Sequence, residues 1–133
     1  IRAHLFAALG AMRTGLNILT EEEGVAVDEI RGHGGFFKTA EVGQKIMAAA
    51  TNSRVSLLET AGEGGAWGMA LLAAYAARKD RSSTLPDFLA SVFAESPVTV
   101  VEPDPEDVRG FQRFFERYSS GLDIERAAVE SLR

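Results

Sequence analysis

Two segments of the chain share one layout, in which a short strand-like stretch is followed by a glycine cluster and then by a helix-like stretch. The first is EIRGHGGFFKTAEVGQKIMAAA, residues 29–50, and the second is RVSLLETAGEGGAWGMALLAAYA, residues 54–76. Strands that alternate with helices are typical of α/β proteins, because neighbouring parallel strands need long crossover connections. This repeated order predicts an α/β fold, with a small sheet that we expect to continue in sequence outside the chain.

Periodicity and punctuation predict the other elements. A leucine-rich stripe predicts a helix over residues 2–20, and Gly24 is its expected stop. Thr39 is the expected cap of a helix that runs to residue 50, and Asp104 with Pro105 is expected to begin the last helix, which Gly121 would break. The remaining expectations are helices at 66–78 and 85–93 and strands at 27–32, 54–59 and 97–103.

Composition excludes several classes of function. The 133 residues suffice for one domain, and 14 basic against 19 acidic residues give a net charge of −5, which argues against nucleic acid or an anionic membrane as the partner. Without cysteine, and with only two distant histidines, we expect no metal site built from protein side chains. No apolar run approaches the ~20 residues of a membrane helix, so we expect a cytoplasmic protein. The sequence leaves its oligomeric state open, and a homo-oligomer is compatible with it.

The two glycine clusters are candidate anion sites. A helix N-terminus presents unpaired N–H groups and a partial positive charge, and glycine lets a ligand approach the backbone closely. Lys38 would add a charge at the first cluster, and Thr39 a hydroxyl. Neither cluster matches a Walker loop or a dinucleotide fingerprint. From the residues alone, a phosphate site and a purely structural turn therefore both stay open.

The stretch GHGGFFKT at 32–39, Gln44 in the helix that follows, and the pattern E-x-x-A-x-G-x-A-x-L-A from Glu63 to Ala73 resemble the carboxy-terminal domain of the FGGY family of carbohydrate kinases. The ending TVVEPDPEDVRGFQRFFERY, residues 99–118, is similar to that family's usual close. The resemblance implies the actin-like ATPase fold, which is built on ribonuclease-H-like sheets. It also implies that residues 1–133 form a nucleotide-binding domain.

The resemblance implies a set of nucleotide-binding residues. Gly34 and Gly35 match the first two glycines of the family's Gly-Gly-Gly-Ala-Lys-Ser motif, Lys38 its lysine and Thr39 its hydroxyl. Phe36 and Phe37 stand where the family has a third glycine and an alanine. The second motif, which packs near the adenine end, contributes Glu63 and Gly68. Trp67 is expected in the core.

The implied reaction transfers the γ-phosphate of MgATP to a sugar hydroxyl, with a ketopentose such as xylulose or ribulose as the expected acceptor. The family's catalytic Asp lies upstream of this region, so no catalytic residue is assigned here. We expect the chain to be a fragment that lacks its amino-terminal domain and is inactive alone. The apolar face of the helix from Leu5 to Leu19 is the expected contact with that domain. A non-catalytic nucleotide-binding or regulatory module, and a purely structural domain, are the alternatives.

Overall fold

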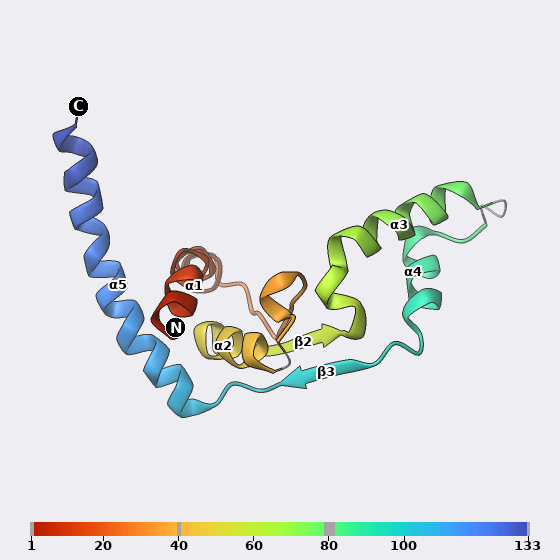
Figure 1. Ribbon diagram of the computed structural model, residues 1–133, viewed down its shortest axis with the longest axis horizontal. Helices are drawn as coiled ribbons and strands as arrows, with labels where there is room; N and C mark the ends of the chain where they lie inside the picture. The colour runs from red at the N-terminus through yellow and green to blue at the C-terminus, as the bar shows by residue number, and fades with distance from the viewer. Residues whose placement is uncertain (1, 40, 79–81, 133) are drawn as a thin grey trace.

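The computed structural model describes residues 2–39, 41–78 and 82–132 (Figure 1). The chain is mixed α/β, and its helices and strands follow the predicted order. The elements are α1 (Arg2–Asn17), the π-helical turn η1 (Ile18–Glu22), β1 (Glu29–Arg31), the 3-10 turn η2 (Gly35–Phe37), α2 (Val42–Thr51), β2 (Arg54–Leu58), the 3-10 turn η3 (Glu59–Glu63), α3 (Gly64–Ala77), α4 (Leu85–Phe93), β3 (Val98–Val101) and α5 (Pro105–Ser131). In the described ranges, no helix is both long and apolar enough to cross a membrane.

The three strands form one sheet in the order β1-β2-β3. β1 and β2 are parallel, with Ile30 opposite Val55, and α2 forms the crossover between them. β3 runs antiparallel to β2, with Val101 opposite Val55. Because β1 and β2 are parallel, the two glycine clusters that follow them lie at the same end of the sheet.

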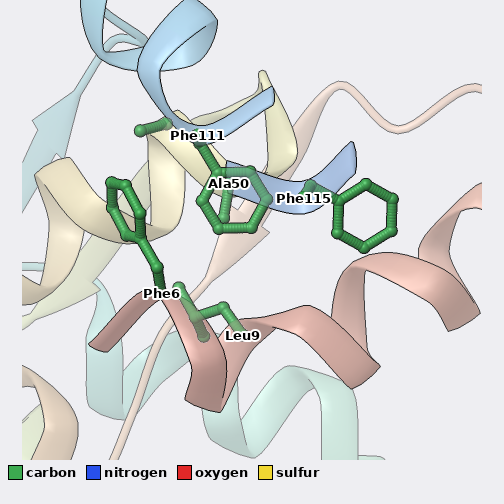
Figure 2. Close-up of a cluster of buried hydrophobic side chains, with 6 residues drawn as sticks. Phe6, Leu9, Ala50, Phe111 and Phe115 are labelled. Atoms are coloured by element: carbon green, nitrogen blue, oxygen red, sulfur yellow. The ribbon is translucent and has the colours of Figure 1, made fainter. Parts of the chain in front are cut away.

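The largest core cluster joins α1, α2 and α5. Its buried members are Phe6, Leu9, Ala49, Ala50, Phe111 and Phe115, most of which Figure 2 labels. The rings of Phe6 and Phe111 meet edge to face with their centroids 5.1 Å apart. Part of the apolar stripe of α1 is therefore covered by this chain's own α2 and α5. The large exposed apolar side chains of α3 are instead Trp67, Met69 and Leu72.

Two predictions about helix ends are wrong. Thr39 does not cap α2, which begins at Val42 after Glu41, and Glu41 has a left-handed φ of 61°. Gly121 does not break α5, which continues to Ser131. The predicted cap of α5 is confirmed, because the Asp104 carboxylate accepts hydrogen bonds from the amides of Glu106 and Asp107.

Candidate functional site at the carboxyl ends of β1 and β2

The first glycine turn follows β1 and is a short 3-10 turn. The amide of Phe37 donates to the carbonyl of Gly34 at 3.1 Å, and the amide of Lys38 donates to that of Gly35 at 3.2 Å. Gly34 has φ 95° and ψ −176°, a conformation that residues with a side chain rarely adopt. Phe37 is buried against Ala48 and Val55, which anchors the turn to the sheet and to α2. The aromatic residues at 36 and 37 therefore serve packing, while the glycines before them carry the turn.

The second glycine turn, η3 and the start of α3, packs directly on the first. The amide of Gly34 donates to the carbonyl of Ala61 at 2.6 Å. A Cβ on Gly64 would lie only 2.9 Å from the Cβ of His33, so this close approach requires glycine. The two turns thus form one surface, and both belong to the same end of the parallel strand pair.

An ion pair bridges the two turns on their solvent side. The ammonium Nζ of Lys38 donates to Oε1 of Glu63 at 2.7 Å. Both side chains are largely exposed, at 58 % and 75 %. The hydrogen bond from Lys38, followed by its charge, lowers the pKa of the Glu63 carboxyl below its ordinary value. Lys38 is therefore a cation held at the junction and accessible to solvent.

A cavity of about 730 Å³ opens beside the turns. Its polar end includes Arg31, His33 and Thr60, and its apolar walls come from α3 and α4. The side chains of these apolar walls include Trp67, Leu71, Leu72, Leu89 and Phe93. The volume lies within the ~300–1,000 Å³ of pockets that bind small molecules.

The cavity changes the interpretation of two sequence segments. Trp67 was expected in the core but is 40 % exposed and lines the cavity. The wall contributed by α4 was missed, although its amphipathic sequence LPDFLASVF was a signal that its apolar face needs a partner. His33, which follows β1, also lines the cavity.

The structure brings most of the predicted site residues together. Gly34, Gly35 and Lys38 lie in the first turn, and Glu63 reaches Lys38 from the second. Gly68 lies further along α3, where it lines the cavity. Thr39 is exposed beside Lys38, and its hydroxyl has no hydrogen-bond partner among the described residues. Chemically, the junction offers the Lys38 cation, open glycine backbone and an apolar cavity.

A second acidic group organises the polar end of the cavity. Glu29 accepts hydrogen bonds from the Ser56 hydroxyl and from Nε of Arg31, the latter at 3.3 Å. The Ser56 hydrogen bond, followed by that of Arg31, lowers the pKa of the Glu29 carboxyl.

Across the residues that the structure describes, no three His, Cys, Asp or Glu side chains form a group that could hold a metal ion.

Comparison with known proteins covers the candidate site. The model of the FGGY family of carbohydrate kinases, C-terminal domain, matches residues 1–77, from the start of the chain to the end of α3, and so includes both glycine turns. The match does not extend to α4, β3 and α5. Neither the curated proteins nor the solved structures contain a significant match. The matched region is more than half of the chain, and the chain therefore belongs to the FGGY family of carbohydrate kinases, as part of their C-terminal domain.

Proposed function

We propose that this chain is the ATP-binding portion of a carbohydrate kinase that transfers the γ-phosphate of MgATP to a sugar hydroxyl. The observation that carries the proposal is the junction itself. Two glycine turns at the carboxyl ends of parallel strands are tied together by the bond from Gly34 to Ala61, and Lys38 lies across them. Ligands of open α/β sheets bind at this end of the strands.

The nucleotide would lie along the surface that the two turns share. Its phosphates would approach Gly34 and Gly35, where a Cβ on Gly35 would meet no atom within 4 Å. Lys38 would supply positive charge, and the exposed hydroxyl of Thr39 a hydrogen bond. The base would enter the cavity beside Gly68, where apolar walls from α3 and α4 can cover a flat ring.

Glu63 has an indirect part in this proposal. A carboxylate does not attract a phosphate, so its contribution is to hold the Lys38 ammonium at the junction before the nucleotide arrives. Phosphate oxygens would then replace Glu63 as the partner of Lys38. Positioning and charge stabilisation of this kind supply most of the catalysis in phosphoryl transfer.

The rest of the reaction belongs to another part of the kinase. We propose that an amino-terminal domain supplies the catalytic Asp and most of the sugar contacts, and that a ketopentose is the acceptor. Mg²⁺ usually keeps several waters and binds through phosphates and only one or two carboxylates. The polar junction suits a metal–nucleotide complex in that form, with the protein holding the phosphates. We further propose that the strands belong to a ribonuclease-H-like sheet of the actin-like fold.

Calorimetric titration of the chain with ADP tests the proposal. We expect saturable binding that Lys38→Ala weakens at least tenfold, because a charge-assisted contact to phosphate is lost. Lys45→Ala is a matched control. Lys45 also donates to a carboxylate at 2.7 Å, that of Glu41, and its side chain is 58 % exposed, like that of Lys38.

The outcomes separate the proposal from its alternatives. Binding that is lost in Lys38→Ala and kept in Lys45→Ala supports the junction as the phosphate site. A folded chain that binds no ADP, or binds it equally well in both variants, contradicts the proposal and leaves the glycines as structural turns. A non-catalytic nucleotide module would bind ADP in the same way but lack phosphotransfer when joined to its natural upstream sequence.

A further inference from the structure

A second, separate groove lies between the N-terminal parts of α1 and α5. It has a volume of about 690 Å³ and is lined by four arginines, which are Arg2, Arg109, Arg113 and Arg117. We call it the arginine groove. Figure 1 shows α1 and α5 at one end of the molecule and α3 with α4 at the other. The arginine groove is therefore distinct from the candidate nucleotide site.

Three of the four arginines have no partner among the residues that the structure describes. Arg109, Arg113 and Arg117 are exposed and make no hydrogen bond or ion pair with any residue that the structure describes. They recur every four residues along α5, so each faces another positive charge on the same side of the helix. Like charges at this spacing disfavour a helix. This arrangement does not stabilise α5, although the chain as a whole has more acidic than basic residues.

The fourth arginine is held in place. The guanidinium of Arg2 donates to Oδ1 of Asp107 and lies over the ring of Phe6, 5.2 Å from its centroid. Phe6 and the half-buried Phe114 also line the groove. Their ring centroids lie 5.4 Å apart, and the two rings give the groove an apolar part beside the charged groups.

Charge and shape together select the ligand. Glu106 and Asp107 are the only acidic residues of the lining, so four positive charges face two negative ones. Guanidinium groups bind phosphate through pairs of parallel hydrogen bonds. The volume fits a small molecule, and the net charge of −5 disfavours an extended polyanion. We propose that the arginine groove binds a small anion that carries two or more phosphate groups.

Titration with inorganic pyrophosphate tests this proposal in the full chain. To remove any contribution of the nucleotide site, the titrations are made in the Lys38→Ala background. We expect saturable binding that the double change Arg113→Ala, Arg117→Ala weakens at least tenfold. Arg126→Ala is the matched control, because Arg126 lies on the same helix, outside the groove, and pairs with Asp123 at 3.4 Å.

Three results would overturn the proposal. The first is no pyrophosphate binding by a chain whose circular dichroism and melting temperature show that it is folded. The second is equal loss of binding in Arg126→Ala, or citrate binding as tightly as pyrophosphate, since either means non-selective anion attraction. The third is self-association that depends on Arg113 without pyrophosphate binding, which would assign the groove to an acidic surface of a second copy. Because none of the four arginines lines the nucleotide cavity, a negative result here leaves the ADP experiment unaffected.

Discussion

The ammonium of Lys38 lies 2.7 Å from Oε1 of Glu63, and this contact joins two turns that are 25 residues apart in the sequence. The same cation is the proposed phosphate ligand. An internal carboxylate and an incoming phosphate therefore compete for it. Exposed ion pairs are weak, typically about 0.2–1 kcal/mol, so a nucleotide can displace Glu63 at small cost.

Glu63→Gln should tighten ADP binding about two- to fivefold, because the competing anion is removed while the side chain keeps its size. Calorimetric titration measures the change. Glu41→Gln is the control, since Glu41 holds Lys45 by the same type of contact, at 2.7 Å. Weaker ADP binding in Glu63→Gln would mean that the carboxylate itself helps to bind the nucleotide complex.

Gly34→Ala should lower the free energy of unfolding by about 1–2 kcal/mol, because Ala is strained at positive φ. Gly34 has φ 95°. Gly35→Ala should have little effect, since Gly35 lacks a positive φ and its Cβ would occupy open space. Urea denaturation of the two variants measures the difference. Equal stabilities would show that the turn adjusts to relieve the strain.

Gln44→Leu should destabilise the fold by about 1–3 kcal/mol, the range for leaving buried polar groups unpaired. Gln44 is 2 % exposed, and its Nε2 donates to the carbonyls of Val55 and Thr99, both at 3.1 Å. From its place on α2, the Gln44 side chain thereby links the backbones of β2 and β3. Gln112→Leu, at an exposed position of α5, is the control, and the denaturation midpoint is the measurement. Unchanged stability would mean that the strand pairing alone holds β3.

Lowering the pH should destabilise the folded state, because acid protonates carboxylates that are paired with lysines in the fold. Hydrogen bonds from Lys45 and Lys38 lower the pKa values of Glu41 and Glu63 from the ordinary 4.5. Each pair therefore stabilises the folded state fully above about pH 4.5, and the contribution is lost as the pH falls through the lower folded values. In urea denaturation between pH 6 and pH 3, the double variant Glu41→Gln, Glu63→Gln should lose less stability than the unchanged chain. Parallel losses in the two proteins would contradict this assignment.

The periodicity of apolar residues predicted the helices and strands well, because a long apolar stripe marks the face of an element that is buried. Phe111 and Phe115 are four residues apart, the spacing of one helix face, and both lie in the core. The predicted helix break at Gly121 was wrong, because one glycine destabilises a helix by only about 1 kcal/mol, which the surrounding helical residues offset. The predicted cap at Thr39 was wrong, because α2 begins after Glu41, whose φ is left-handed. The local sequence carries no signal for this conformation.

Long-range geometry was beyond the sequence. The antiparallel direction of β3 and the packing of α1 against α5 depend on contacts between residues at least 40 positions apart in the sequence. The candidate site was predictable in part, because glycines and Lys38 next to strand ends carry chemical meaning on their own. The cavity was not predicted, since its walls from α3 and α4 carry apolar side chains that resemble any core residue in sequence. That ambiguity explains why Trp67 was assigned to the core.

The sheet order has a consequence for the colloidal behaviour of the chain. Among the described strands, β1 and β3 are the outer ones, and each leaves backbone groups that another strand could pair with. β1 is three residues long, and charged Glu29 and Arg31 at its two ends act as gatekeepers against aggregation. β3, with the sequence VTVV, has no charge, and Val98 and Val100 are 54 % and 46 % exposed. Concentrated solutions of this chain should therefore aggregate through strand addition at β3 rather than at β1.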